Sequence, residues 1–303
     1  MSAPQQALRK YFGHDSFRDG QEEVIASILS DRSALAVFPT GGGKSLCYQL
    51  PALLFNELTL VVSPLIALMK DQVDSLVTKG IPAARLDSTL SADETSKLYR
   101  RLEKNKIRLL YVAPERLANE NFRKRLAKTP LALLAIDEAH CISEWGHNFR
   151  PDYLKLTRFA DELKIPRVLC LTATATPQVA NDICKHFQIQ PQDHHQLTFY
   201  RANLDLVITP IATHDRPEYI LKQIQKSPIQ PTIIYTTLQH GAESLASFLK
   251  SKGLSVRPYH AGLRSEARSE IQDAFMSGEV PIICATIAFG MGIDKSDIRA
   301  IHH

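Results

Sequence analysis

Short apolar runs alternate with longer segments of helical periodicity along almost the whole chain. Short apolar runs bounded by turn residues are typical of buried strands, whereas apolar residues three and four positions apart are typical of amphipathic helices. The strands expected in the first two thirds of the chain are Ala34–Phe38, Thr59–Ser63, Ala83–Leu86, Arg108–Val112, Leu131–Ile136 and Val168–Thr172. The helices expected between them are Leu65–Lys79, Ala92–Asn105, Glu115–Lys128, Tyr153–Leu163 and Gln178–Phe187.

The rhythm breaks at Gln188–Leu204, where polar residues and a proline predict a linker, and then it restarts. The strands expected beyond the linker are Leu206–Ile211, Thr232–Thr236, Ser255–Tyr259, Ile282–Thr286 and Arg299–His302, with helices at Pro217–Lys226, Gly241–Lys252 and Ser265–Ser277. Strands that are apolar throughout and separated by helices indicate parallel sheets covered on both faces. We therefore predict an α/β protein of two domains, residues 1–204 and 205–303.

Two helix ends carry recognisable signals. Ser91 and Glu94 have the spacing of a capping box, in which each side chain satisfies a free backbone N–H at the start of a helix. Gly253 follows a helical segment and is suited to the left-handed conformation that ends many helices.

The composition is that of a soluble globular protein. The 303 residues are 44% hydrophobic and 22% charged, which argues against a disordered, collagen-like or coiled-coil chain. A length of 303 also suggests about two domains of roughly 150 residues each. The longest apolar runs are far shorter than the ~20 residues of a membrane span, and the N-terminal stretch lacks the apolar core of a secretory signal. We expect no association with a membrane.

The net charge is only +4, but one stretch is much more basic than the rest. Lys97–Lys128 contains 11 Lys or Arg residues and three Glu residues. Such a run is either a solvated helix surface or a face for nucleic acid.

The cysteines and histidines do not suggest a metal site. The five cysteines are scattered without zinc spacing and predict buried, reduced thiols in a cytosolic protein. The pairs His194-His195 and His302-His303 have no second ligand set beside them. A catalytic Ser or Cys elbow is also missing from the sequence.

The sharpest motif is Phe38-Pro-Thr-Gly-Gly-Gly-Lys-Ser45, between a strand and a helical segment. Glycines allow the backbone N–H groups to turn toward a phosphate chain, with the helix N-terminus behind them. A nucleotide would be bound by Thr40, Gly41, Gly42, Gly43, Lys44 and Ser45. In this arrangement Lys44 reaches the β- and γ-phosphates and the Ser45 hydroxyl binds Mg²⁺. The pattern is a variant of the P-loop, because Phe38 stands where the strict motif has glycine.

A second motif, Leu131-Ala-Leu-Leu-Ala-Ile-Asp-Glu-Ala-His140, is an apolar strand that ends in acidic residues. It places Asp137 at the carboxyl edge of a parallel sheet, where ligands bind. We expect Asp137 to hold Mg²⁺, Glu138 to act as the general base on the attacking water, and His140 to sense the γ-phosphate or a neighbouring element. An acidic pair after a strand is otherwise often only a solvated turn.

Together these motifs resemble the superfamily 2 helicases, and further matches resemble their RecQ family. Phe12-Gly-His-Asp-Ser-Phe-Arg-Asp-Gly-Gln21 looks like the adenine-reading motif of that family, which implies that Arg18 stacks on the base and Gln21 bonds to its edge. The family commonly has Tyr where this chain has His14. The runs Val61–Gln72, with Ser63, and Tyr111–Arg116 resemble its contacts to the DNA backbone.

The most diagnostic resemblance is Cys141-Ile-Ser-Glu-Trp-Gly-His-Asn-Phe-Arg-Pro-Asp-Tyr153, directly after the acidic motif. It looks like the aromatic-rich loop that couples single-strand binding to ATP hydrolysis in the RecQ family. Trp145 and Phe149 are suited to stack on bases of any sequence, and His147 and Arg150 would add polar contacts. The alternative is a core loop packed by its Trp and Phe.

Weaker matches follow in the family's order. Leu171-Thr-Ala-Thr-Ala-Thr176 resembles the motif that relays hydrolysis to strand separation, and its hydroxyls are expected to bond to the Asp137–His140 motif. Tyr259-His-Ala-Gly-Leu263 resembles a DNA contact that includes His260, and Ala285–Lys295 resembles the motif that places Asp294 against the ribose. Ile233–Glu243 departs from the family near Gln239, where a basic residue is usual.

The resemblance implies two tandem RecA-like domains, ATP and Mg²⁺ as cofactors, and single-stranded and forked DNA as partners. It stops at His303, before the family's arginine-finger segment, so we expect a second domain that is C-terminally incomplete and weak hydrolysis by this form. The implied activity is ATP-dependent 3′-to-5′ DNA unwinding in repair and recombination, in the cytoplasm at the nucleoid or in a nucleus. The alternatives are a motor-deficient nucleotide- and DNA-binding remnant, and another superfamily 2 translocase or RNA helicase.

Overall fold

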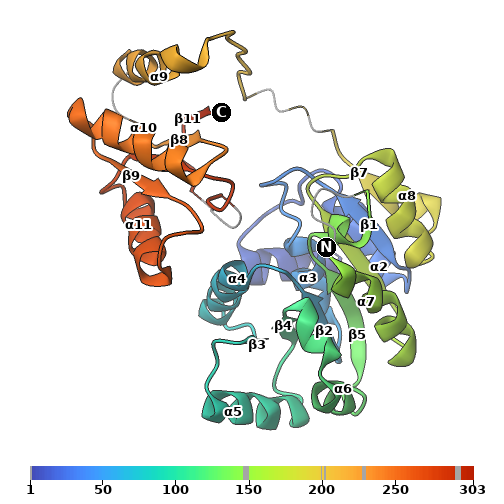
Figure 1. Cartoon of the computed structure of the whole chain (residues 1–303). Coiled ribbons are helices and arrows are strands. Elements are labelled where there is room, and N and C mark those ends of the chain that lie inside the picture. Colours follow the sequence, from blue (N-terminus) through green and yellow to red (C-terminus); the bar gives the residue numbers. More distant parts are fainter. Residues whose placement is uncertain (1, 146–149, 199, 201–202, 227–229, 291–294) are drawn as a thin grey trace. The chain divides into compact units, whose positions relative to one another are not determined.

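The computed structural model describes residues 2–145, 150–198, 200, 203–226, 230–290 and 295–303. Within them the chain forms two compact units, Met1–Ala202 and Asn203–His303. Each unit is a parallel sheet between helices (Figure 1), so the predicted α/β fold with two successive sheets is confirmed. No helix in the described ranges is long and apolar enough to cross a bilayer.

The first unit contains seven strands in the order β3-β4-β2-β5-β6-β1-β7, and all of their described pairings are parallel. Its strands are β1 (Ala34–Val37), β2 (Leu58–Val62), β3 (Ala83–Leu86), β4 (Leu109–Val112), β5 (Leu131–Ile136), β6 (Val168–Thr172) and β7 (His194–Gln196). Its α-helices are α1 (Ala3–Ala7), α2 (Gln21–Leu29), α3 (Leu46–Leu54), α4 (Ile66–Thr78), α5 (Ala92–Glu103), α6 (Glu120–Leu126), α7 (Pro151–Glu162) and α8 (Pro177–His186). A π-helical turn, η1 (Leu8–Phe12), and 3₁₀ turns, η2 (Pro114–Ala118), η3 (Ala139–Ile142) and η4 (Pro191–Asp193), complete it.

Alternate residues of each strand face opposite cores, because side chains of a strand point to the two faces in turn. Leu35 and Val37 of β1 belong to one core cluster with residues of α5, α6, α7 and α8, whereas Ala34 and Ala36 belong to another with residues of α2, α3 and α4. Both faces of the sheet are therefore buried, which explains why its strands are apolar throughout.

The second unit is a smaller version of the same design, a four-stranded sheet in the order β11-β8-β10-β9. Its elements are η5 (Thr213–Asp215), α9 (Arg216–Gln225), β8 (Thr232–Tyr235), α10 (Gln239–Ser251), β9 (Val256–Tyr259), α11 (Ser265–Ser277), β10 (Ile282–Ala285) and β11 (Ala300–His302). Helices α9 and α10 cover one face, with Leu221 and Leu249 in the core, and α11 covers the other through Phe275.

Several details differ from the sequence predictions. The strand expected at Leu206–Ile211 is absent, and Leu206 and Ile208 are 87% and 96% exposed. A short apolar run forms a strand only where a neighbouring strand pairs with it, and this segment has no ladder partner among the described residues. The expected linker Gln188–Leu204 contains β7, which pairs with β1.

The predicted helix Glu115–Lys128 is split into η2 and α6, because the Asn119 side chain accepts a hydrogen bond from Phe122 N at 2.9 Å and starts a new helix. The capping box of Ser91 and Glu94 and the left-handed Gly253 (φ 85°) are confirmed. The five cysteines are free, and four of them are buried.

Candidate functional site

Four neighbouring strands of the first sheet place the main sequence motifs along one edge. The sheet runs β2-β5-β6-β1 across its centre, and in parallel strands the carboxyl ends lie on the same side. Ser63 follows β2, Asp137 follows β5, Thr172 ends β6, and Phe38 begins the loop after β1. The fold therefore assembles at one edge residues that are more than one hundred positions apart in sequence.

The loop after β1 is shaped by its glycines. Gly41 and Gly43 have φ values of 78° and 75°, in the left-handed region that favours glycine. A Cβ on Gly42 would lie 2.9 Å from the carbonyl oxygen of Pro39, so the loop is also sterically closed to larger residues there. The N–H groups of Gly41, Gly43 and Lys44 donate to no residue that the structure describes. These amides remain able to bind an anion.

Lys44 is held against the same loop. Its ammonium donates to the carbonyls of Phe38 at 3.0 Å and Pro39 at 3.4 Å. Burial lowers the pKa of Lys44, and the carboxylates of Glu138 and Asp137 partly oppose that shift. Thr40 is exposed at the loop tip, and Ser45 is half-buried where the loop meets α3.

Arg18 and Gln21 lie against the glycine loop. Gln21 Nε2 donates to Gly43 O at 3.0 Å, while Gln21 Oε1 accepts from Arg18 N at 2.9 Å. The Arg18 guanidinium donates to Gly41 O at 2.6 Å. An amide offers two donors and two acceptor positions, so Gln21 keeps one of each for a ligand. Adenine presents a matching pair of donor and acceptor on one edge.

A cavity of about 600 Å³ opens beside these residues. The side chains and backbone that line it come from the N-terminal segment, the glycine loop, α3 and α4: Phe12, Gly13, His14, Asp15, Ser16, Phe17, Arg18, Gln21, Gly43, Ser45, Leu46, Gln49, Gln72, Ser75 and Lys79. The expected adenine motif and the phosphate loop thus line one cavity, which has the size of a small-molecule site.

Asp137 and Glu138 form an acidic pair at the end of β5. Asp137 accepts hydrogen bonds from the Ser63 hydroxyl at 3.3 Å and from Glu138 N at 3.0 Å. Burial, together with the neighbouring charge of Glu138, raises the pKa of Asp137 to about 6. Glu138 itself has a φ of 51°, which is uncommon for a residue with a Cβ and marks a constrained position.

His140 connects the acidic pair to the neighbouring strand. Its Nδ1 lies 3.2 Å from a carboxylate oxygen of Glu138 and 3.0 Å from the Thr172 hydroxyl. Burial alone would lower the pKa of His140, but interactions with Cys141 and Glu138 outweigh it and raise the pKa to about 9. The hydrogen bond expected between the threonine motif and the acidic motif is therefore confirmed. The Thr172 hydroxyl also donates to Thr174 O at 2.9 Å.

The loop after His140 is anchored at both ends of its described part. The Ser143 hydroxyl donates to Asp182 of α8 at 2.7 Å, and Trp145 N donates to the Ser143 hydroxyl at 3.3 Å. Arg150 N donates to Cys141 O at 3.0 Å. Trp145 is 70% exposed, so its ring does not pack in the core. His147 and Phe149, expected in the same loop, lie outside the described residues.

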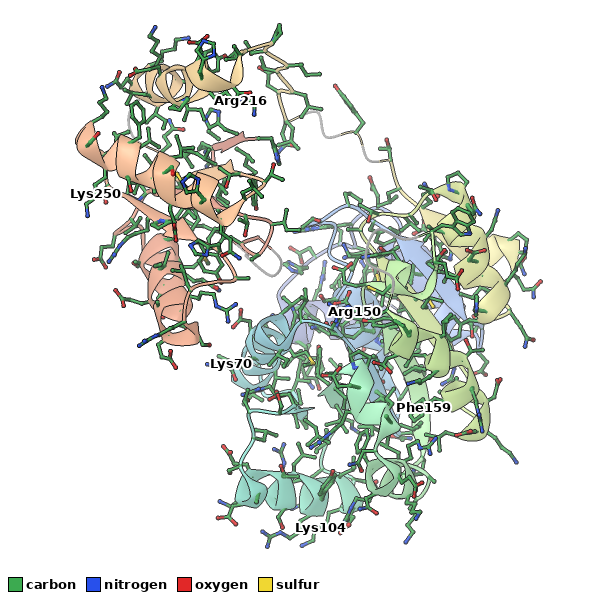
Figure 2. The ribbon with its side chains drawn as sticks, viewed as in Figure 1. Lys70, Lys104, Arg150, Phe159, Arg216 and Lys250 are labelled. Carbon is green, nitrogen blue, oxygen red and sulfur yellow. The ribbon has the colours of Figure 1, made fainter. Side chains whose placement is uncertain are left out.

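Two residues expected to contact DNA are buried in this structure. Ser63 is bonded to Asp137, and His260 in the second unit lies 3.1 Å from a carboxylate oxygen of Glu243. Arg150 is exposed ahead of α7 (Figure 2). Asp294, expected at the ribose, lies outside the described residues.

Tyr153 is a site residue to which sequence reasoning gave no role. It is fully buried, and its hydroxyl donates to Asp137 O at 3.1 Å, so it fixes the backbone of the acidic motif. Its only sequence signal was its position at the end of the aromatic-rich stretch.

The oxygen ligands at this edge suit a magnesium ion carried with a nucleotide. Mg²⁺ prefers a few protein oxygens together with phosphate oxygens and water, and Asp137 and Ser45 offer a carboxylate and a hydroxyl. Among the described residues no group of three or more His, Cys, Asp or Glu side chains is arranged to hold a metal by itself. The arrangement fits a metal that arrives with phosphates.

Comparison with known proteins gives a consistent result. Residues 18–183 match the DEAD/DEAH box helicase family, and residues 215–303 match the helicase conserved C-terminal domain. The chain is 43% identical over 301 residues to the ATP-dependent DNA helicase RecQ of Bacillus subtilis and 41% identical over 300 residues to that of Haemophilus influenzae. These matches cover 99% and 98% of this chain but 51% and 48% of the relatives, so the chain spans about half of their length.

A solved structure shares the fold at low sequence identity. The Mycobacterium smegmatis helicase Lhr bound to ssDNA and AMP-PNP matches with a TM-score of 0.73 and 20% identity, over 99% of this chain and 43% of that one. At this identity the likeness shows the fold alone.

Proposed function

Because this chain belongs to the DEAD/DEAH box helicases and to their RecQ branch, we propose that it is the motor core of an ATP-dependent DNA helicase. In this proposal ATP hydrolysis drives movement along single-stranded DNA, 3′ to 5′, and the opening of duplexes and forks during repair and recombination. The observation that carries the proposal is the meeting of Lys44, Asp137 and Glu138 at one sheet edge beside the cavity that Arg18 and Gln21 line.

ATP binding is assigned to the glycine loop and its neighbours. The free amides of Gly41, Gly43 and Lys44 would bind phosphate oxygens, and the Lys44 ammonium would move from its carbonyl contacts to the terminal phosphates. Gln21 and Arg18 would bind the base from the loop's other side. When bound, Mg²⁺ neutralises phosphate charge, and Asp137 and Ser45 would hold it.

Hydrolysis is assigned to Glu138 as the base that accepts a proton from water. The nearby His140, whose pKa is raised to about 9, lies 3.2 Å from a Glu138 carboxylate oxygen and would hold that side chain in place. In this assignment Glu138, with its left-handed backbone (φ 51°), would serve the water while Asp137 serves the metal. General-base catalysis of this kind contributes about 10²–10⁴-fold in rate.

Coupling to DNA is assigned to the loop that begins at His140. His140 contacts both Glu138 and Thr172, and the same turn leads to the exposed Trp145. If the Trp145 indole stacks on a base, a shift of Trp145 would be transmitted through its backbone hydrogen bond to Ser143, and from there to the turn η3 that carries His140. We place the activity in the cytoplasm at the nucleoid, or in the nucleus of a eukaryotic cell.

The test is an ATPase assay of the 303-residue chain with and without single-stranded DNA. We expect stimulated turnover that Lys44→Ala abolishes by weakening ATP binding and that Glu138→Gln abolishes while ATP still binds. The exposed residues Lys185 and Glu22 provide charge-matched controls, as Lys185→Ala and Glu22→Gln, with unchanged turnover.

Two results would contradict the proposal. DNA binding without any turnover would identify a motor-deficient binding protein instead. Equal stimulation by RNA would indicate a different superfamily 2 translocase.

A further inference from the structure

A groove runs between α5 and α6 of the first unit, away from the glycine loop. It consists of two adjoining cavities of about 830 Å³ and 550 Å³ that share Tyr99, Glu103 and Arg125 in their walls. One cavity includes Ala92 at the start of α5, and the other includes Asn105 just beyond its end. The groove therefore follows the length of α5.

The groove arises from how the two helices meet the sheet. Leu98 and Leu102 of α5 and Phe122 and Leu126 of α6 are buried in the same core, so the polar residues of both helices face outward. Tyr99 lies between them, and the Arg125 guanidinium lies 4.5 Å from its ring centroid and 2.6 Å from Glu103 Oε1. One face of the aromatic ring is thus already covered by a cation.

The charge of this surface is strongly positive and largely uncompensated. Five cations line the groove, and two of them, Lys124 and Arg125, have a carboxylate within 4.0 Å. Arg100, Arg116 and Lys128 have no acidic partner among the described residues. Glu103 is the one acidic residue among the described groove walls, and Arg125 neutralises it. Arg116, another wall residue, has a buried Nε without a hydrogen-bond partner in the described chain.

The neutral residues of the groove can also donate hydrogen bonds. Asn105, Asn119 and Asn121 line the larger cavity, as does Thr129, whose hydroxyl already donates to Arg125 O at 3.2 Å. The Asn119 carbonyl oxygen is used by Phe122 N, so its amide nitrogen remains to donate outward. Cations together with side-chain amides are the groups that bind phosphate and sugar oxygens without reading sequence.

We propose that the groove between α5 and α6 binds the backbone of single-stranded DNA. It would be a second DNA-binding site, separate from the residues assigned to ATP hydrolysis and from the loop that carries Trp145. The inference rests on the proposed function, in which DNA is the partner. We commit to a single strand because the cations and side-chain amides of the groove match the phosphate and sugar oxygens of a nucleic-acid backbone. Figure 2 shows Lys104, at the end of α5, well separated from Arg150 in the same unit.

The test compares short and long oligothymidylates by fluorescence anisotropy. The groove variant is Arg100→Gln/Lys124→Gln/Lys128→Gln. The matched control is Arg216→Gln/Lys222→Gln/Lys250→Gln, at exposed positions of α9 and α10, and Figure 2 labels Arg216 and Lys250. We expect the groove variant to bind an oligonucleotide of about 30 residues roughly 10- to 50-fold more weakly at about 0.15 M salt. The slope of log affinity against log salt should fall by about 2, from three contacts of about 0.7 each.

Short oligonucleotides distinguish binding at the groove from the DNA binding that stimulates ATP turnover. An oligonucleotide of about 8 residues occupies the motor site alone, so the groove variant should bind it normally and keep its stimulation of ATP turnover. In the unaltered protein, the long strand should protect Lys124 and Lys128 from acetylation and the short strand should not.

Four outcomes would overturn the inference. If the groove and control variants bind the long strand with equal affinity, the groove does not bind DNA, and the proposed function is unaffected. A larger loss for duplex than for single strands would assign the groove to duplex DNA, and competition by polyglutamate at matched charge would assign it to acidic protein. Failure of the unaltered chain to bind either oligonucleotide would refute the proposed function, and the groove with it.

Discussion

The carboxylate of Asp137 is held where ionisation is unfavourable, so replacing it should stabilise the fold. Its pKa rises from 3.8 to about 6, chiefly through burial and then through repulsion by Glu138. At about 1.4 kcal/mol for each pH unit, the disfavoured ionisation corresponds to about 3 kcal/mol. Because the sheet edge is partly open to solvent, we expect Asp137→Asn to raise the free energy of unfolding by about 1–2 kcal/mol at pH 8.

The stabilisation by Asp137→Asn should depend on pH in one direction only, which follows from the raised pKa of Asp137. A carboxyl group whose folded pKa is raised binds more protons in the folded state, so the folded protein loses stability as pH rises from 3.8 to about 6. Above pH 6 the whole penalty is present. The stabilisation by Asp137→Asn should therefore be largest at pH 7–8, shrink as pH falls through 6, and vanish near 3.8.

The assay is urea unfolding followed by far-UV circular dichroism with a metal chelator present, at pH 8, 6 and 5. Asp161→Asn on the exposed end of α7 is the matched control and should change stability by less than about 0.5 kcal/mol. Glu138 N can still donate to the amide oxygen, and the Ser63 hydroxyl, which bonds to the other carboxylate oxygen, can accept from the amide nitrogen instead, so the local geometry is kept. The same variant should lose ATP turnover by about 100-fold or more, because an amide binds Mg²⁺ poorly.

A gain that is independent of pH would refute the electrostatic explanation, since an amide does not titrate. A loss of stability at pH 8 would refute it as well. It would show that the carboxylate contributes more through its hydrogen bonds than its ionisation costs.

Two further predictions concern single hydrogen bonds. Thr172→Val removes the hydroxyl beside His140 and should lower kcat for ATP about tenfold with little change in KM. The control Thr174→Val, at an exposed side chain, should leave both constants unchanged. Steady-state kinetics measures both constants, and an effect on KM alone would contradict the prediction. Asn119→Ala removes the N-cap of α6 and should lower the free energy of unfolding in urea by about 1 kcal/mol. An equal decrease for the control Asn121→Ala, which removes no cap, would show that capping is not the cause.

The sheets could be predicted from the sequence because their strands are buried on both faces. Runs such as Leu131–Ile136 have no other stable arrangement than the middle of a covered sheet, and the structure places it there as β5. Strands were predicted wrongly where pairing with a neighbouring strand, rather than the local sequence, decides whether a segment becomes a strand. His194–Gln196 is polar and becomes a strand because β1 offers an edge, whereas the apolar Leu206–Ile211 does not.

The sequence motifs indicated the candidate residues and one contact, between the threonine motif and the Asp137–His140 motif, but not the other contacts of the site. Motif spacing brought Lys44, Asp137 and Glu138 to one edge, because strand ends in a parallel sheet coincide. The bond between Ser63 and Asp137 follows from β2 lying beside β5, an order in the sheet that no local pattern specifies. The basic run at Lys97–Lys128 was visible as charge, but the groove depends on how α5 and α6 pack.

The residues with the strongest chemical assignments are also those that local rules disfavour. Glu138 adopts a left-handed backbone, which costs about 1–2 kcal/mol for a residue with a Cβ. Lys44 and Asp137 both have pKa values shifted toward their neutral forms by burial. The buried strands β1 and β5 offset these costs, because Lys44 lies in the loop after β1 and Asp137 and Glu138 directly follow β5. A charged phosphate and its metal would relieve the unfavourable burial of both ions, so the same strain that lowers stability increases the affinity for a nucleotide.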